Sequence, residues 1–367
     1  MRKYKSLVLG LEHFIDKIGY RDEAFRHYYH PVKYLVSDNS GFSLPFAEKY
    51  NADISIVPKN KLMRLIFIIR YIIKKEFTHA EFYYSGYMVF LYVLACKIMR
   101  KKTLSFLIGA EFIAERNILW FLFLKKSLWA CDGIIAKQKN LYEEAGKLGL
   151  TEKMLLLPNA IKAYSGKILN YEDRDIDILF LNTPRKDRNL FLLIDALRIA
   201  ITENKNLKLC IVGFSVLSRI ANKLEPEYQN SILEYIEQKK MNENIIIKPF
   251  VNNPYDYHIR SKIFVLPADC IFLNYSMLES MSCGTVPVVT KGDGWELIIN
   301  RENGFVSEFD SKQFSNQIQN ALIKENWMKK SNKARETVIN NYDIKNWGRK
   351  ILVFKGILDE NVNMQKV

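Results

Sequence analysis

The stretch PADCIFLNYSMLESMSCGTVPVV, residues 267–289, decides the fold of this chain. A short apolar run, Ile263–Leu266, leads into it and predicts a buried strand, and Val286–Thr290 predicts a second one. Between them lies a predicted helix, Tyr275–Cys283, which ends before Gly284. This order of strand, loop, helix and strand is typical of parallel α/β sheets, in which ligands bind beyond the carboxyl ends of the strands.

The amino end of this helix is suited to an anion. Backbone N–H groups near Asn274, Tyr275 and Ser276 have no partner within the helix, and the positive end of the helix dipole lies there. A pyrophosphate fits such a terminus. Glu279 lies more than one turn further on, where its carboxylate can accept hydrogen bonds from a ribose diol. The alternative is a capped helix with a solvated Glu279.

The same alternation of short apolar runs and helix-period runs extends along the whole chain. Predicted strands are Ser6–Leu11, Lys33–Val36, Asp53–Val57, Glu81–Tyr84, Leu104–Ile108, Gly133–Ala136, Met154–Leu157, Asp177–Leu181, Leu207–Val212 and Ile245–Lys248, besides the two above. Predicted helices are Leu62–Lys75, Met88–Arg100, Asn117–Cys131, Lys139–Leu148, Arg188–Thr202, Glu227–Lys240 and Ser311–Lys324. We therefore predict two doubly wound α/β domains, residues 1–165 and 174–342, joined by a polar linker at about 162–174 and followed by a helix within 343–367.

The loop after the predicted strand Asp177–Leu181 is basic. Arg185, Lys186 and Arg188 stand at the carboxyl edge of the strand, where cations can neutralise a diphosphate leaving group. The alternative is a solvated basic loop without a ligand.

These motifs resemble the donor-binding signature of the family 4-like glycosyltransferases, which have the GT-B fold. In that fold two Rossmann-like domains face each other across a cleft, and a C-terminal helix returns to the N-terminal domain; Trp347 would then be a packing residue. Leu278–Gly284 are in register with the family pattern L-E-A-M-A-C-G-x-P-V, and Pro287-Val288 match its P-V with one more residue before the Pro. The resemblance assigns Glu279 to the ribose of the nucleotide. Ile271 stands where the family has the first Glu of its E-x7-E motif, so we expect an altered donor sugar or weaker binding.

The resemblance also implies further donor contacts. The family pattern G-R-x-x-x-x-K-G places Asn182, Thr183 and Arg188 on its Gly, first Arg and Lys, and Arg185 is predicted to replace the missing Arg. The full predicted set for the donor is Asn182, Thr183, Gly213, Phe250, Phe272, Leu273, Asn274, Tyr275 and Glu279, with Arg185, Arg188 and Glu279 as the catalytic residues. In the first half, Glu12 and His13 are candidates for acceptor contact, with ordinary surface residues as the alternative.

Positive charge is concentrated in the first half of the chain. The formal net charge is +14, and residues 1–165 hold 26 Lys and Arg against 15 Asp and Glu, whereas the remaining 202 residues hold 28 against 25. This excess favours a membrane surface or a phosphate-bearing substrate, although lysines that only confer solubility are the alternative. Within Asn60–Lys75 a broad apolar surface carries five cations, which favours either contact with anionic lipid or a buried crossover helix with a polar edge.

Cysteine usage and hydropathy bear on the compartment. The five cysteines are dispersed and show no metal-binding spacing, which fits a reduced compartment. The start of the chain is typical of a first strand rather than a signal peptide. The longest stretch without charge, Phe82–Cys96, is 15 residues long and short for a spanning helix. We predict a cytoplasmic protein, either free or at the inner face of the membrane.

The resemblance implies a retaining glycosyltransferase that needs no metal ion. It would move a sugar from a nucleotide-sugar donor to a glycan or lipid-linked saccharide acceptor, in the biosynthesis of lipopolysaccharide, another surface polysaccharide or a glycoconjugate. Catalysis would rest on positioning and on stabilisation of the leaving diphosphate. Three alternatives stay open: a GT-B protein that binds without transfer, an epimerase of the same fold, and a nucleic-acid-binding protein. No nucleic-acid-binding motif is present, so we expect no such partner.

Overall fold

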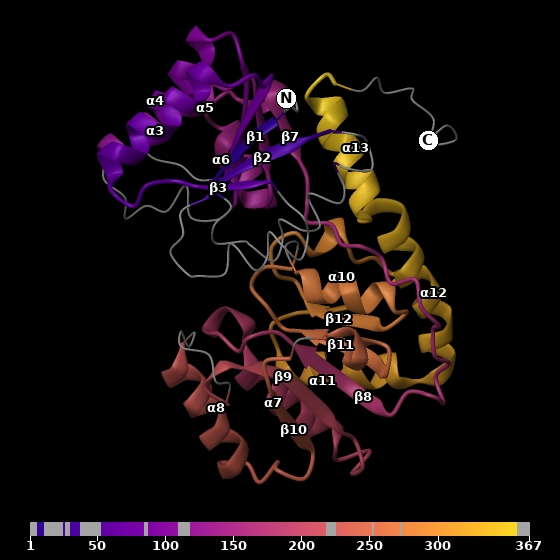
Figure 1. Ribbon diagram of the computed structural model, residues 1–367. Coiled ribbons are helices and arrows are strands. Elements are labelled where there is room, and N and C mark those ends of the chain that lie inside the picture. Colours follow the sequence, from indigo (N-terminus) through magenta and orange to yellow (C-terminus); the bar gives the residue numbers. More distant parts are fainter. Residues whose placement is uncertain are drawn as a thin grey trace. The chain divides into compact units, whose positions relative to one another are not determined.

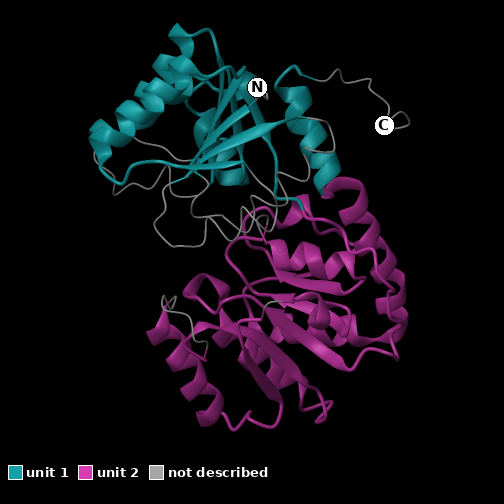
Figure 2. Ribbon diagram, viewed as in Figure 1, with its two compact units in different colours: residues 1–160, 344–367 teal, residues 161–343 magenta. Residues whose placement is uncertain are grey.

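The computed structural model describes residues 6–10, 25, 30–36, 53–83, 87–108, 118–217, 225–251, 253–271 and 274–357. The chain divides into two compact units, residues 1–160 with 344–367 and residues 161–343 (Figure 2). The stretch predicted as a linker, 162–174, lies within the second unit. Its last residue, Arg174, is buried and donates to the carbonyl oxygens of Ser261 and Cys283 at 2.6 and 2.8 Å, which ties this segment to the second unit.

The first unit is built on a parallel sheet. Its described strands pair in the order β3-β2-β1-β4-β5-β6-β7 (Figure 1). Their bounds are β1 Ser6–Leu9, β2 Val32–Val36, β3 Ile54–Ile56, β4 His79–Phe82, β5 Lys102–Leu107, β6 Gly133–Ala136 and β7 Met154–Leu156. The helices between them are α3 Lys61–Lys74, α4 Tyr87–Ile98, α5 Ile118–Ala130 and α6 Lys139–Gly146.

Both faces of this sheet are covered. Successive residues of a strand point to opposite faces. Leu7 and Leu9 of β1 accordingly share a core cluster with Ile68 of α3, whereas Val8 belongs to the cluster that contains Trp347. Strands buried on both faces explain why the sequence shows continuous apolar runs rather than alternation.

The C-terminal helix α13, Ile344–Phe354, belongs to the first unit, as predicted. Trp347 is buried in the core and its indole N–H donates to the carbonyl oxygen of Pro158 at 3.0 Å. Just beyond the helix, the buried ammonium of Lys355 pairs with the carboxylate of Glu81 and donates to Ser6 Oγ at 2.8 Å. Trp347 is therefore a packing residue, and the helix is fastened to the sheet at both ends.

The second unit has its own parallel sheet, with the described strands in the order β10-β9-β8-β11-β12-β13. The strands are β8 Ile176–Leu181, β9 Leu209–Phe214, β10 Ile245–Pro249, β11 Ser261–Leu266, β12 Val286–Thr290 and β13 Phe305–Ser307. The helices are α7 Leu190–Ala200, α8 Pro226–Gln238, α9 Tyr255–His258, α10 Tyr275–Ser282, α11 Ser311–Leu322 and α12 Lys324–Asn341. Two doubly wound α/β units confirm the predicted fold class. In the described part of the chain, no helix is both long and apolar enough to cross a bilayer.

Candidate functional site

Three loops follow the carboxyl ends of β8, β11 and β12 and together form a rim of the second unit. The rim comprises residues 182–189, 267–271 and 291–294. Because adjacent parallel strands end at the same edge of a sheet, these loops meet although they are far apart in sequence. The amide of Asp269 donates to the carbonyl oxygen of Asp187 at 3.0 Å, and the amide of Asp293 donates to that of Asp269 at 2.7 Å. The predicted basic loop and the loop before α10 therefore hold each other in place.

Gly213 in β9 allows the first of these loops to approach the sheet closely. Its φ of 120° lies in a region that L side chains rarely adopt. A Cβ atom on Gly213 would lie 2.5 Å from the carbonyl oxygen of Asn182, well inside van der Waals contact. Asn182 in turn donates its amide to the carbonyl oxygen of Val212 at 3.1 Å. Gly213 thus sets the position of Asn182.

We expect Gly213→Ala to lower the free energy of unfolding by about 1–3 kcal/mol, because the new methyl group meets strained backbone and a fixed carbonyl oxygen. Denaturant unfolding measures this. The matched control is Asn230→Ala, which places the same residue on the exposed side of α8 and should change stability by less than about 0.5 kcal/mol. Equal stability of the Gly213→Ala variant and the natural protein would contradict this role of Gly213.

The amino end of α10 lies beside Asn182. Asn274 is the N-cap residue, and its side-chain oxygen accepts a hydrogen bond from the amide of Met277 at 2.8 Å. Its side-chain amide donates to Asn182 Oδ1 at 3.3 Å. Among the described residues, the buried Asn182 Nδ2 and Ser276 Oγ atoms have no hydrogen-bond partner. Unsatisfied polar groups next to a helix amino end favour an anionic ligand.

The two predicted arginines differ in their surroundings. Arg185 is partly exposed and donates to Asp187 Oδ2 at 2.7 Å. Arg188 is only 17% exposed, and its Nε atom, 3.9 Å from that same carboxylate oxygen, makes no hydrogen bond within the described structure. Burial lowers the pKa of the Arg188 guanidinium, which means that its charge is poorly solvated. A buried cation of this kind is stabilised when an anion binds next to it.

Glu279 faces a histidine that the sequence did not single out. Oε2 of Glu279 lies 3.6 Å from Nε2 of His258, and Nδ1 of that ring is 2.5 Å from Ser280 Oγ. His258 is completely buried, whereas the Glu279 side chain keeps 13% of its surface exposed. The ring is therefore held from one side by Ser280 and presents its other nitrogen to the carboxylate. Nothing in the local sequence around His258 indicates that it lies next to Glu279. The short helix α9 brings the two side chains together only in the folded unit.

The other predicted donor residues lie at different places around the same edge. Ile271 is fully buried, and its amide donates to the carbonyl oxygen of Asp293 at 3.0 Å. Its side chain is therefore a packing residue of this loop. Tyr275 and Thr183 are half-buried, and Phe250 after β10 is 59% exposed. Phe272 and Leu273, like Glu12 and His13 in the first unit, lie outside the described residues.

Metal-ligating side chains do not cluster in the described ranges. No group of three or more His, Cys, Asp and Glu residues there is arranged to hold a metal ion. The rim carries the cations Arg185, Lys186, Arg188 and Lys291 and the carboxylates of Asp187, Asp269 and Asp293.

The sequence model of the family described as "Glycosyl transferases group 1" matches residues 164–341, which are almost the whole second unit. The second unit of the chain belongs to the group 1 glycosyltransferase family. The match to this family begins and ends within three residues of the second unit, so the rim described above is a feature of the glycosyltransferase domain.

Solved structures with this fold cover nearly the whole chain. A glycosyltransferase from Rickettsia africae has a TM-score of 0.79 at 16% identity and covers 98% of this chain and 100% of its own. Anabaena HepE in complex with UDP has a TM-score of 0.77 at 12% identity, over 96% of this chain and 100% of its own. These neighbours confirm the GT-B fold of the chain.

One curated relative matches part of the chain. It is the N-acetylgalactosamine-N,N'-diacetylbacillosaminyl-diphospho-undecaprenol 4-alpha-N-acetylgalactosaminyltransferase of Campylobacter jejuni, 27% identical over 168 residues. The match spans 44% of this chain and 42% of that protein, and so less than half of each.

Proposed function

We propose that this glycosyltransferase transfers a sugar from a nucleotide diphosphate sugar to a glycan or lipid-linked saccharide acceptor, with retention of the anomeric configuration. The observation that carries the proposal is the junction of two loops. Hydrogen bonds between Asn182 and Asn274, and between Asn189 and Asp269, bring the loop of Arg188 and the amino end of α10 to one edge of the sheet. A diphosphate needs a cation and hydrogen-bond donors together, and this edge supplies Arg188 together with Asn182 Nδ2 and Ser276 Oγ, which are unsatisfied among the described residues.

In this proposal the protein acts mainly on the leaving group. As the bond between the sugar C1 atom and the diphosphate oxygen breaks, negative charge develops on the diphosphate. Arg188 and the positive end of the α10 dipole are already in position to stabilise that charge, so little reorganisation is needed. Arg185 contributes after leaving its pair with Asp187. Glu279 accepts hydrogen bonds from the ribose, and the proposal includes no metal ion.

The nucleotide and the acceptor are proposed from the chemistry of similar proteins. HepE structures contain UDP or UDP-glucose, so we propose a uridine diphosphate sugar as donor. The Campylobacter relative is named for a diphospho-undecaprenol acceptor, and a lipid-linked acceptor is proposed here as well, in surface-polysaccharide or glycoconjugate synthesis at the cytoplasmic face of a membrane. Ile271 offers no carboxylate to the transferred sugar, so other groups must bind its hydroxyls, or the sugar lacks one of them.

The first test compares uridine, UMP and UDP as ligands in thermal unfolding. We expect UDP to raise the melting temperature and uridine to have little effect, because the diphosphate makes the main contacts. Release or transfer of sugar from UDP-sugars then shows catalysis. Binding of UDP-sugars without any hydrolysis or transfer would instead support the degenerate GT-B protein, which the buried Ile271 favours. Stabilisation by uridine equal to that by UDP would contradict the diphosphate site.

We expect Glu279→Ala to weaken donor binding by about ten- to a hundredfold, because hydrogen bonds to a charged group contribute about 1.5–3 kcal/mol. Isothermal titration with UDP measures the dissociation constant. Glu234→Ala is the matched control, since Glu234 is exposed on α8 of the same unit. Unchanged donor affinity and unchanged turnover in the Glu279→Ala variant would refute the assignment of Glu279 to the ribose.

A further inference from the structure

The exposed side of α3, α4 and α5 carries many large apolar side chains. Of the 22 large hydrophobic residues that are exposed in the described part of the chain, 12 belong to these three helices. They are Leu62, Met63, Ile66 and Ile73 on α3, Tyr87, Leu91, Leu94 and Ile98 on α4, and Ile118, Leu119, Leu122 and Trp129 on α5. The helices pack side by side, α3 against α4 and α4 against α5 (Figure 1).

These side chains form a face rather than a scatter. On α3, Leu62, Ile66 and Ile73 lie within about 40° of arc at 3.6 residues per turn. The buried Ile68 and Ile72 lie about 80–160° away from them around the helix and face the core. An apolar stripe that faces away from the core is not needed for folding, and a surface of this size marks a site of interaction.

The charge on this face has one sign. The three helices contain seven Lys or Arg residues and no Asp or Glu. Arg70, Lys74, Lys125 and Lys126 are exposed, and none of them forms an ion pair within the described structure. Lys97 is paired with Asp132, which follows α5. The face therefore attracts an anionic surface and has unpaired cations to meet it.

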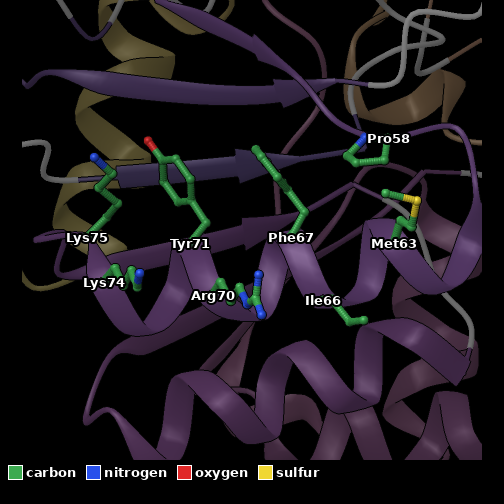
Figure 3. Close-up of a pocket in the computed structure, with 8 residues that line it drawn as sticks. All are labelled: Pro58, Met63, Ile66, Phe67, Arg70, Tyr71, Lys74 and Lys75. Carbon is green, nitrogen blue, oxygen red and sulfur yellow. The ribbon is translucent and has the colours of Figure 1, made fainter.

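A groove along α3 combines both properties. It has a volume of about 470 Å³. Met63, Ile66 and Phe67 lie toward one end of it, and Arg70, Lys74 and Lys75 lie toward the other (Figure 3). An apolar channel with cations at one end matches an amphiphile, whose chain and anionic headgroup are separated in the same way.

An anionic lipid bilayer fits this face better than a second copy of the chain. In a two-fold dimer the same patch meets itself, so a face without acidic residues would be placed against its own cations. A bilayer instead offers acyl chains to the apolar side chains and phosphates to the lysines, whose long aliphatic stems can span the boundary.

We propose that the exposed side of α3, α4 and α5 is a docking face for an anionic bilayer, and that it places the glycosyltransferase beside a lipid-linked acceptor. The docking face rests on the geometry of the first unit alone, and only its purpose rests on the proposed function. The two can therefore fail separately.

Flotation with vesicles tests the docking face. We expect the full chain to float with vesicles of phosphatidylcholine and phosphatidylglycerol, to bind weakly to phosphatidylcholine alone, and to be released by high salt. Arg70→Glu/Lys74→Glu and Lys125→Glu/Lys126→Glu should each weaken binding by about tenfold or more, since each cation near an anionic surface adds about fivefold to partitioning. Leu122→Ser should also weaken it.

The matched control is Lys312→Glu/Lys329→Glu, which makes the same charge change at exposed positions of α11 and α12. It should bind vesicles like the natural protein, and stabilisation by UDP should be unchanged in every variant. Equal loss of binding in the control would show that only net charge matters and would overturn the docking face. So would the absence of flotation, or a dimer in sedimentation that the charge reversals abolish. Flotation without sugar transfer would leave the face in place and count against the proposed function.

Discussion

Replacing Arg188 by Ala is expected to lower the turnover number by about 10²- to 10³-fold, the effect of removing one preorganised donor to a developing negative charge. The guanidinium is largely buried, so its field is weakly screened by water. Its Nε atom has no hydrogen-bond partner in the described structure, which leaves it available to a diphosphate. The variant should bind the nucleoside diphosphate more weakly as well, and steady-state kinetics with the donor identified by thermal unfolding measures both effects.

Three further variants separate catalysis from general effects. Arg188→Lys should recover part of the activity, because an ammonium keeps the charge but loses the bidentate geometry. Arg185→Ala should have a smaller effect, since that side chain is more exposed and already paired with Asp187. Arg198→Ala on the exposed side of α7 is the control and should retain full turnover. If the Arg188→Ala variant unfolds at the same temperature and turns over like the natural protein, Arg188 has no part in the reaction.

Replacing Lys355 by Met is expected to lower the free energy of unfolding by about 3–5 kcal/mol, the cost of leaving a buried charge without its partner. Both side chains of the pair, Lys355 and Glu81, are fully buried. Lys355 also donates to Ser6 Oγ, which lies 2.8 Å from Nε2 of His30. The substitution therefore disturbs a hydrogen-bonded network that joins the chain after α13 to strands β1 and β4. Denaturant unfolding followed by tryptophan fluorescence measures the loss.

The double variant Lys355→Met/Glu81→Leu is the decisive comparison. Removing both charges should restore much of the lost stability, because the desolvation cost of each group disappears with it. Lys350→Met, at an exposed position of α13, is the control and should change the free energy of unfolding by less than about 0.5 kcal/mol. Equal effects of Lys355→Met and Lys350→Met would contradict a buried pair that fastens the helix.

Much of the fold follows from hydrophobic pattern alone. The predicted strands and helices are present, and where both ends were predicted they differ from the observed ends by no more than two residues. Strands such as Leu209–Phe214 are buried on both faces, so their sequences are continuous apolar runs with a clear length. The core clusters confirm that these runs, rather than the helices alone, make up the interior.

Two of the elements that were not predicted, α12 and β13, carry weak patterns. Helix α12 buries Trp327, Ser331, Ala334 and Val338, a narrow stripe that includes a polar and a small residue within a mostly polar sequence. Strand β13, Phe305–Ser307, has three residues, too few for a periodicity to be visible. Both are fixed by what they pack against, so the isolated sequence contains little trace of them.

The candidate site was predicted in part. The helix amino end at Asn274 and the basic loop with Arg188 were expected, since each follows from a local pattern of strand, loop and helix. The 3.6 Å approach of His258 to Glu279 and the pairing of Arg185 with Asp187 were not. The roles of the site residues stay predictions that the variants above test.

The sequence by itself determined that the chain forms two parallel α/β units and that its ligand-binding loops follow particular strands, because apolar periodicity, glycine positions and helix ends are local properties. Only the tertiary structure decided which loops meet. Strand β8 lies between β9 and β11, and this order brings Asp187 to Asp269. In the first unit, packing of the chain after α13 against β4 brings Lys355 to Glu81. Such contacts depend on the order of strands in the sheet, which burial of both faces and right-handed crossovers select together, and no single segment encodes that choice.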